Sequence, residues 1–156
     1  MRAVIQKVLS ATITVEGEII ASIEQGLLVY LGVAASDTES VCEWMVEKIL
    51  SLRLFPEGQQ YFHRSVIDEA LPILVVSQFT LYGETAKGRR PDFVRAMKPE
   101  LAEGLYEHFL ALLRSRMPGR VSCGKFRAHM LVSSVNDGPV TLLCEREHAE
   151  GNRNSA

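Results

Sequence analysis

Alternating and unbroken apolar segments predict strands over residues 3–33. Residues 12–15 and 19–23 flank Glu16-Gly17, where glycine supplies the positive φ of a tight hairpin turn. Residues 26–33 form a continuous apolar run, which is typical of a strand buried on both faces. We therefore expect a hairpin followed by a buried strand.

Helical spacing follows this strand. Ser36 and Glu39 have the spacing of a capping box, and Val41, Met45 and Ile49 then recur every four residues. This pattern predicts an amphipathic helix that begins near Ser36 and packs its apolar stripe on the sheet.

A second helix is expected to begin at Pro99 and to end at Pro118-Gly119, because proline suits the first turn of a helix and glycine its end. Its expected apolar stripe comprises Leu101, Leu105, Phe109 and Leu112.

The other apolar segments predict strands over residues 73–81, 128–135 and 140–145, the last two joined by a turn at 136–139. Residues 59–70 are expected to form a loop or a short hairpin. Residues 83–98 show no periodicity, which inside a compact domain indicates a functional loop or a disordered one. Strands outnumber the two separate helices, so the pattern predicts an α+β fold with a strongly bent sheet.

Size and charge narrow the class of protein. At 156 residues the chain fits one domain, and its net charge of −2 excludes a wholly basic nucleic-acid coat or a polybasic membrane protein. The longest stretch without charge, residues 70–83, is shorter than the roughly 20 residues of a membrane helix. Charged residues interrupt the apolar runs near the start, so no signal peptide is expected.

The three cysteines, Cys42, Cys123 and Cys144, are odd in number and share no CxxC spacing. They are typical of buried thiols in a reducing compartment, which favours a cytoplasmic protein. The four histidines lack metal-ligand spacing, so neither a metal nor a cofactor is expected.

Ser77-Gln78-Phe79-Thr80 places two hydroxyls and an amide where a core strand reaches the surface. Pockets form at such places, although a strand end that only satisfies its own backbone would have the same composition. No G-x-S-x-G elbow surrounds Ser77. Because no paired carboxylates or obvious strong base accompany these groups, an enzyme built on them needs an activated substrate such as an ester.

Asn136-Asp137-Gly138-Pro139 fits a simple turn between two strands. However, Pro139 removes a backbone donor where pairing should resume, and an X-Pro bond is where a cis peptide costs only about 0.5–1 kcal/mol. Gly138 also leaves its carbonyl unshielded by a side chain. The segment is therefore either a turn or a specialised backbone feature.

Five of the twelve residues 87–98 are basic, and Asp92 is the one acidic residue among them. Lys87, Arg89 and Arg90 lead this segment. In a slightly acidic chain such an excess suits a few phosphates, while a solvated basic loop is an equally good interpretation.

Ser77-Gln78-Phe79-Thr80 and Asn136-Asp137-Gly138-Pro139-Val140-Thr141 together resemble the two signature motifs of the D-aminoacyl-tRNA deacylases. The opening Met1-Arg2-Ala3-Val4-Ile5-Gln6, the Gly26-Leu27-Leu28-Val29 run, Lys87-Gly88-Arg89-Arg90-Pro91 and Glu100-Leu101-Ala102 are also similar to that family. The similarity covers residues 1–145 in unbroken order.

The resemblance implies a homodimer of layered, barrel-like β-sheets (ββα) with two main helices outside. A single deacylase domain is expected over residues 1–146, followed by a flexible polar tail over residues 147–156. The implied activity is hydrolysis of the ester of D-aminoacyl-tRNA, and also of glycyl-tRNA, as chiral proofreading. The implied partners are the aminoacyl-tRNA 3′ end and a second copy of the chain, with no membrane and no DNA.

The resemblance also assigns residues. Ser77, Gln78, Phe79 and Thr80 would line the catalytic pocket, and the 2′-hydroxyl of the RNA would help to activate water. A cis Gly138-Pro139 peptide would reach into the partner's pocket, where its carbonyls occupy the space of an L side chain. Lys7, Met130 and Asn136 would support the site, and Lys87, Arg89 and Arg90 would bind tRNA.

Several positions depart from the family pattern. Lys7 replaces an arginine thought to brace the proline loop, and an ammonium cannot make a bidentate fork. His63 replaces a common asparagine, and Ala70-Leu71 replaces two glycines. Arg127 and His129 interrupt the usual Phe-Gly-Ala block before Met130.

Two other functions remain open from the residues. One is a non-catalytic nucleic-acid-binding dimer, which would have no need of Gly138-Pro139. The other is a small-molecule esterase with Thr80 or Ser77 as nucleophile, which should form a covalent acyl intermediate.

Overall fold

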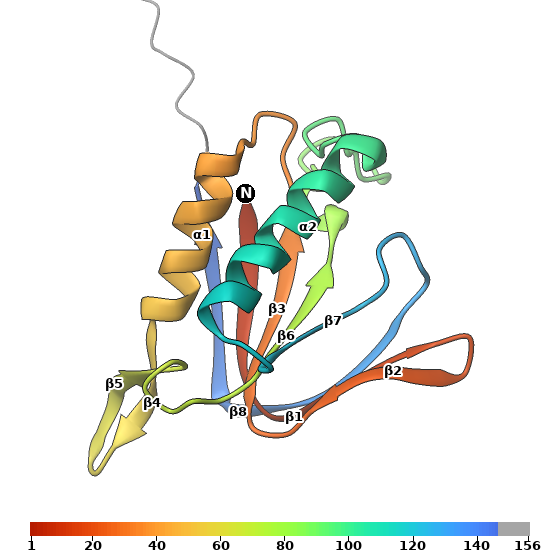
Figure 1. Cartoon of the computed structure of the whole chain (residues 1–156). Coiled ribbons are helices and arrows are strands. Elements are labelled where there is room, and N and C mark those ends of the chain that lie inside the picture. The colour runs from red at the N-terminus through yellow and green to blue at the C-terminus, as the bar shows by residue number, and fades with distance from the viewer. Residues whose placement is uncertain (147–156) are drawn as a thin grey trace, which may run out of the picture.

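The computed structural model describes residues 1–146 as an α+β domain in which two helices cover one face of a strongly curved sheet (Figure 1). The strands are β1 (Arg2–Val15), β2 (Glu18–Ile23), β3 (Gly26–Gly32), β4 (Arg53–Glu57), β5 (Gln60–Ser65), β6 (Ile73–Ser77), β7 (Val121–Cys123) and β8 (Leu131–Glu145). The helices are α1 (Glu39–Ser51), α2 (Pro99–Arg116) and the short 3₁₀ helix η1 (Phe79–Tyr82). The expected fold class is confirmed, whereas the expected tail, residues 147–156, lies outside the described residues.

Strand β1 organises the sheet. Its first half pairs with β3, its second half with β2, and β8 runs antiparallel to it along nearly its whole length. The sheet continues through parallel pairs from β3 to β6 and from β6 to β7. Because β1 changes one partner half-way, the sheet bends into a nearly closed barrel, and β4 with β5 forms a separate hairpin (Figure 1).

The curved sheet buries apolar side chains on both faces. Leu27, Val29 and Leu31 of β3 pack beneath α1 and α2, whereas Leu28 joins a second cluster inside the curve. The expected hairpin over residues 12–23 and the doubly buried strand after it are therefore confirmed.

The expected capping box at Ser36 is wrong. Helix α1 begins at Glu39 with Thr38 as its N-cap, and no side chain caps it. The neighbouring Asp37 is buried, where one carboxylate oxygen pairs with the Met1 ammonium at 2.5 Å and the other accepts the Ala34 N–H at 2.7 Å. This tertiary ion pair, which local spacing does not reveal, fixes the turn before the helix.

The buried stripe of α2 is also displaced from the expected one. Phe109 is buried as expected, but Leu101 is 65% exposed, and Leu105 and Leu112 are half-buried. The buried residues of the helix are Ala102, Tyr106, Phe109, Leu110 and Leu113. The buried stripe is shifted by about one residue, or 100° around the helix, so that Tyr106 and Phe109 enter the core while Leu105 and Leu112 pack against its edge.

Two strand predictions need correction. The strand expected over residues 73–81 ends at Ser77, and η1 follows. The two strands expected at the end of the chain are one strand, β8, because residues 137–140 form an irregularity opposite Lys7 and pairing with β1 resumes in the same direction. Residues 136–139 are therefore no hairpin turn, and β7 is an additional strand that the pattern does not predict.

Residues 59–70, expected to form a loop or a short hairpin, contain β5, the second strand of the β4–β5 hairpin, and then a turn over residues 66–70. Cys42 and Cys144 are buried as expected, whereas Cys123 is half-buried; all three are free. Neither long helix of residues 1–146 is sufficiently long and apolar to cross a membrane.

Candidate active site

The main cavity of the described chain opens at the end of β6 and has a volume of about 650 Å³. Four separate parts of the sequence enclose it: the end of β3, residues 77–79, residues 93–106 from the irregular loop into α2, and residues 126–130. Its lining residues are Leu31, Val33, Ser77, Gln78, Phe79, Phe93, Val94, Ala96, Met97, Lys98, Pro99, Ala102, Tyr106, Phe126, Arg127, Ala128 and Met130. Apolar side chains predominate, as in most small-ligand sites.

Three members of the first motif face this cavity because β6 ends there. The Gln78 N–H donates to the Leu31 carbonyl at 2.8 Å, which extends the pairing of β3 and β6 by one residue. The chain then turns into η1, where the Gln78 amide donates to the Thr80 hydroxyl. Thr80 is exposed and lies outside the lining set. Ser77, Gln78 and Phe79 are thus brought together, and Thr80 supports them from the rim.

Aromatic rings form the walls. Phe79 is 59% exposed and meets Phe93 edge-on, with ring centroids 5.1 Å apart. Tyr106 packs against Phe126, and its buried hydroxyl donates to the Val75 carbonyl at 3.3 Å. Burial raises the pKa of Tyr106 above its ordinary value, so this phenol stays neutral and cannot act as a base near pH 7.

The charged lining residues are both cations. Lys98 is the N-cap of α2, and Arg127 lies in the segment before β8. Arg127 is 61% exposed and pairs loosely with Glu100 at 3.7 Å. Its backbone has φ +61°, a left-handed conformation in which a glycine would carry no strain.

The second motif forms a loop that its own side chains hold. The Asn136 side-chain oxygen Oδ1 accepts the Val140 N–H at 3.1 Å, and its side-chain Nδ2 donates to the Val140 carbonyl and the Thr141 hydroxyl, each at 3.2 Å. Lys7 lies opposite this loop on β1 and pairs with Asp137 at 3.0 Å. The side chain of Asn136 thus replaces the strand pairing that residues 137–140 lack.

The Gly138-Pro139 peptide bond is cis, as expected. Gly138 has φ +122°, and a Cβ at that position would lie 2.7 Å from the Val140 side chain, so only glycine fits. Both residues are exposed, and neither lines the cavity of its own chain. The structure brings Met130 to the cavity but leaves Asn136, Gly138 and Pro139 outside it.

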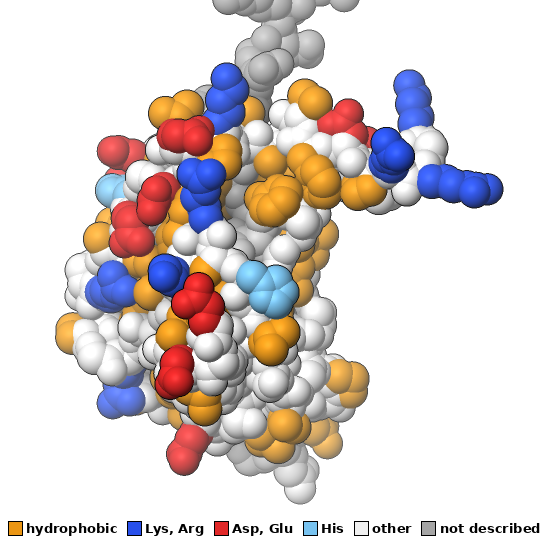
Figure 2. Space-filling view, turned by 90° about the vertical axis from the view of Figure 1, so that its right-hand side faces the viewer, with side chains coloured by type: hydrophobic (Ala, Val, Ile, Leu, Met, Phe, Trp, Pro, Cys, Tyr) orange, Lys and Arg blue, Asp and Glu red, His pale blue; other side chains and the backbone are white. Residues whose placement is uncertain are grey.

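Lys87, Arg89 and Arg90 lie in the exposed loop that carries Phe93, and none of them lines the cavity. A short bridge between Glu84 and Asp92 closes the base of this loop. Figure 2 shows Lys and Arg side chains at the outer end of a projection that overhangs a concave face with hydrophobic side chains. Because the same loop carries Phe93, which lines the cavity, its exposed cations are placed to meet a ligand that extends beyond the cavity.

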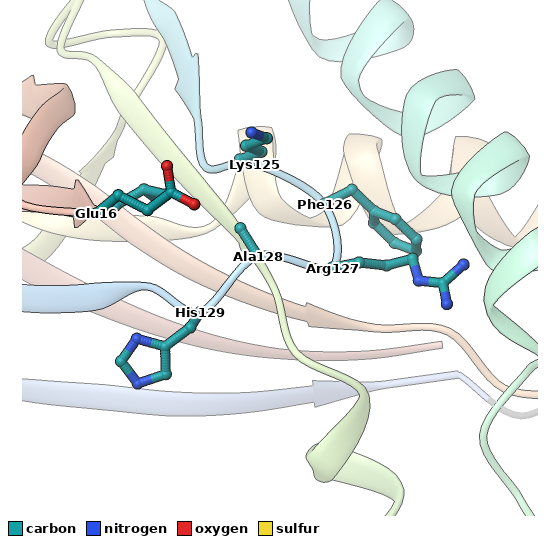
Figure 3. Close-up of a pocket in the computed structure, with 7 residues that line it drawn as sticks. Glu16, Lys125, Phe126, Arg127, Ala128 and His129 are labelled. Atoms are coloured by element: carbon teal, nitrogen blue, oxygen red, sulfur yellow. The ribbon is translucent and has the colours of Figure 1, made fainter.

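A second hollow of about 350 Å³ lies behind residues 126–128 and shares them with the main cavity. Glu16, Lys125 and His129 line it, and Figure 3 shows Arg127 directed away from Glu16 and His129. Within residues 1–146, no group of three or more His, Cys, Asp or Glu side chains could hold a metal ion.

The D-Tyr-tRNA(Tyr) deacylase family model matches residues 4–145, nearly the whole described chain. The chain belongs to this family. It is 48% identical to the D-aminoacyl-tRNA deacylase of Petrotoga mobilis over 147 residues, covering 94% of this chain and 98% of the relative. It is 51% identical to the enzyme of the same name from Myxococcus xanthus over 145 residues, covering 93% and 94%.

Solved structures agree on the fold. A "c-Myc DNA Unwinding Element Binding Protein" superposes with a TM-score of 0.90 at 45% identity, covering 95% of this chain and all of that one. The chain described as "Structural Analysis of a probable eukaryotic D-amino acid tRNA deacylase" superposes with a TM-score of 0.80 at 20% identity, covering 92% and 97%. At that identity the second structure supports the fold alone.

The residues that depart from the family pattern lie in different parts of the structure. Arg127 lines both the main cavity and the hollow behind it, whereas His129 lines the second hollow and not the main cavity. His63 lies in the β4–β5 hairpin, where its Nε2 is 2.9 Å from Glu57. Ala70 has φ +51°, so a common glycine position is strained here. Neither His63 nor Ala70 lines the cavity.

Sequence reasoning missed several cavity residues: Phe93, Met97, Lys98, Ala102 and Tyr106. These residues form no recognisable sequence motif, because they come from a loop and from one face of α2. Only the folded structure brings them together. The irregular stretch 83–98, expected to be a functional loop or a disordered one, is the available signal.

Proposed function

We propose that this protein hydrolyses the ester bond between a D-amino acid and the terminal adenosine of tRNA, releases glycine from glycyl-tRNA in the same way, and thereby proofreads chirality in translation. The observation that carries the proposal is the grouping of Ser77, Gln78 and Phe79 at an apolar cavity in a member of this family. Residues 1–146 form the deacylase domain of this proposal.

The composition of the cavity supports chemistry without a protein base. Among the described residues that line it there is no carboxylate and no histidine, and the Tyr106 phenol is committed to a carbonyl. An aminoacyl ester is already activated, so positioning and polarisation of its carbonyl supply much of what hydrolysis requires. In the proposal Ser77, Gln78, Phe79 and Thr80 hold the ester, and the neighbouring 2′-hydroxyl of the RNA helps to activate water.

Chirality would be selected by backbone. Gly138 and Pro139 of one protomer enter the cavity of its partner, where their carbonyl oxygens occupy the space that an L side chain needs. Three observations support this arrangement: the two residues are exposed, they lie outside their own cavity, and Asn136 and Lys7 hold their loop firmly. Met130 lines the cavity that receives this loop.

Exposed apolar residues on β1 and β8 support a homodimer. Leu9, Leu131, Val135 and Leu143 are each more than half exposed. Ser10 pairs with Val135, so Leu9 and Val135 are close neighbours on adjacent strands. Exposed apolar side chains along two paired strands suit an interface with a second copy of the chain.

The remaining partner is the single-stranded acceptor end of tRNA, whose phosphates Lys87, Arg89 and Arg90 contact. Because aminoacyl-tRNA is the substrate, the proposal locates the protein in the cytoplasm.

Hydrolysis of matched D-Tyr-tRNA and L-Tyr-tRNA by the purified protein tests the function. We expect the D ester to be cleaved at least a hundredfold faster, a ratio that needs only about 2.7 kcal/mol of differential transition-state binding. Equal rates on the two enantiomers, or binding without turnover, would refute the proposal; the second result would favour the non-catalytic binder.

The esterase alternative predicts a different mechanism. With Thr80 or Ser77 as nucleophile, an acyl-enzyme should accumulate and Thr80→Ala should abolish turnover. In our proposal Thr80→Ala retains measurable deacylation, and rapid-quench mass spectrometry of the wild type detects no acylated protein.

A further inference from the structure

The mouth of the main cavity carries positive charge with no carboxylate beside it in the lining. Of its described lining residues, Lys98 and Arg127 are the charged ones, and both are cations. Glu100 neutralises Arg127 only weakly, because the pair is 3.7 Å apart and both side chains are mostly exposed. Exposed pairs of this kind contribute about 0–1 kcal/mol, so a better anion can replace the carboxylate.

Within residues 125–129, the Arg127 side chain points in a different direction from the other charged side chains (Figure 3). Lys125 and His129 line the smaller hollow behind residues 126–128 and not the main cavity. Figure 3 shows the Arg127 guanidinium on the side of Phe126, away from Glu16 and His129. Arg127 lines both hollows and is the one of these three residues that lines the main cavity, so it is placed to contact a ligand there.

The backbone conformation of Arg127 does not favour an arginine at this position. A non-glycine residue in the left-handed region costs about 1 kcal/mol or more, and a glycine would avoid that cost. The guanidinium contributes little in return within the chain, because its carboxylate partner, Glu100, is loosely held and exposed. The position is therefore free to serve a ligand, and it can be changed to glycine without strain.

The chemistry of the ligand follows from the proposed function, on which this inference rests. The ester and the amino acid lie at Ser77–Phe79, so the attached nucleoside extends toward the mouth with its 5′-phosphodiester. That group carries one negative charge, and a guanidinium can donate to two of its oxygens at once. We propose that Arg127 binds the phosphodiester 5′ of the terminal nucleoside, with Lys98 as a second cation beside it.

The test compares two esters that differ only in this group: D-tyrosyl-adenosine and the same ester with a 5′-phosphate. The measured quantity is the ratio of their kcat/KM values, phosphate-bearing over phosphate-free. In Arg127→Gly this ratio should fall about tenfold, through KM, since one charged hydrogen-bonded interaction is worth roughly that factor. Arg127→Lys should retain part of the ratio.

Full-length D-Tyr-tRNA gives a second readout. Removal of one cation from a single-stranded phosphate should reduce the slope of log K against log salt by about 0.7 in Arg127→Gly. Lys125→Ala is the matched control, because it removes the same charge from the same segment but on the side of the other hollow. Its ratio and salt slope should equal those of the wild type. Arg127→Asn, which also tolerates a positive φ, serves if the glycine variant folds poorly.

The outcomes separate the two proposals. An unchanged ratio in Arg127→Gly, or an equal fall in Lys125→Ala, would overturn the phosphate interaction while leaving the deacylase function intact. A wild-type protein that cleaves neither ester nor D-Tyr-tRNA would overturn the deacylase function itself.

Discussion

Ala70 adopts a backbone conformation that is unfavourable for alanine. Its φ is +51°, its N–H donates to the Ile67 carbonyl, and its own carbonyl accepts from Arg120. These hydrogen bonds fix the left-handed conformation, which a side chain disfavours by roughly 1–2 kcal/mol. The family resemblance places a glycine at this position.

Ala70→Gly should therefore raise the free energy of unfolding by about 0.5–1 kcal/mol, the strain relieved less the added entropy of the unfolded chain. Urea denaturation followed by circular dichroism measures this change. Ala111→Gly, in the exposed face of α2, is the matched control and should lower the free energy of unfolding by about 1 kcal/mol. An equal decrease in both variants would mean that the turn at Ala70 carries no strain.

Burial differs among the three cysteines, and their thiol chemistry should differ with it. Burial, and next the nearby Asp37 carboxylate, raises the pKa of Cys42 to about 11, and burial also raises the pKa of Cys144. Cys123 is half-buried, with an Arg114 guanidinium nitrogen 3.3 Å from its sulfur. The thiolate, which is the reactive form, is thus suppressed at Cys42 and Cys144.

Iodoacetamide at pH 8 should accordingly alkylate Cys123 and spare Cys42 and Cys144 in the folded protein, as peptide mass spectrometry would reveal. Because the folded pKa of Cys42 is raised, its contribution to stability is present below about pH 9 and disappears as the pH rises toward 11. Alkylation of Cys42 as fast as Cys123 at pH 8 would contradict this ordering, and the urea-unfolded protein, labelled at all three, is the control.

At the scale of elements, the sequence predicts types of structure better than their boundaries. The apolar runs of β1, β3 and β6 and the helical spacing of α1 and α2 are sufficient to predict the α+β fold, because each burial pattern has one period. The first turn before α1 could not be predicted, since Asp37 is held by an ammonium 36 residues away. Likewise, only tertiary packing decides which of two apolar stripes α2 buries.

The predicted turn at residues 136–139 is wrong for a related reason. Asparagine, aspartate, glycine and proline suit a reversal of direction, but here Asn136 bonds to Val140 and Thr141 and the strand continues along β1. Local composition does not distinguish a chain reversal from a loop within one strand. The motif identifies the residues of interest. Their geometry can be known only when the pairing of β8 with β1 is known.

The irregular loop over residues 83–98 joins two parts of the proposed binding surface, because Phe93 walls the cavity while Lys87, Arg89 and Arg90 lie exposed farther out. Replacing these three cations by alanine should weaken tRNA binding and reduce its salt slope by up to about 2, at roughly 0.7 for each phosphate deprived of its cation. Filter binding over a range of salt concentrations measures both.

Lys48→Ala with Arg53→Ala removes cations from α1 and β4 and is the control; its salt slope should match the wild type. An unchanged slope in the triple variant would assign the loop to solvent. Cleavage of D-tyrosyl-adenosine should persist in the triple variant, because that substrate ends inside the cavity.

At the scale of the whole molecule, the proposed site is incomplete in one chain. The cavity collects residues from four distant parts of the sequence, yet the Gly138-Pro139 loop, fixed by Asn136 and Lys7, lies outside it. A rigid exposed loop and an open cavity on the same chain suit a symmetric dimer, in which each protomer supplies its loop to the other.

Mixed dimers test this arrangement directly. One variant, Gln78→Ala with Phe79→Ala, damages the cavity; the other, Gly138→Ala with Pro139→Ala, damages the loop, since a Cβ at Gly138 would collide with Val140. Each homodimer should be inactive on D-Tyr-tRNA, because the first lacks the side chains that hold the ester and the second lacks the loop that, in the proposal, fills part of the partner's cavity and closes it around the ester. After subunit exchange at equal concentrations, about half of the dimers are mixed, and each has one intact cavity facing one intact loop, so about a quarter of wild-type activity should return.

The mixed-dimer result depends on where the loop acts. If Gly138 and Pro139 completed the cavity of their own chain, every site in a mixed dimer would carry one defect and no activity would return. Mixing either variant with itself controls for concentration, and light scattering tests whether both variants form the proposed dimer. Recovery of activity at protein concentrations above the dimer dissociation constant, and its disappearance on dilution below it, would tie activity to the assembled pair, because within one chain the Gly138 and Pro139 carbonyls lie outside the cavity that they are proposed to restrict.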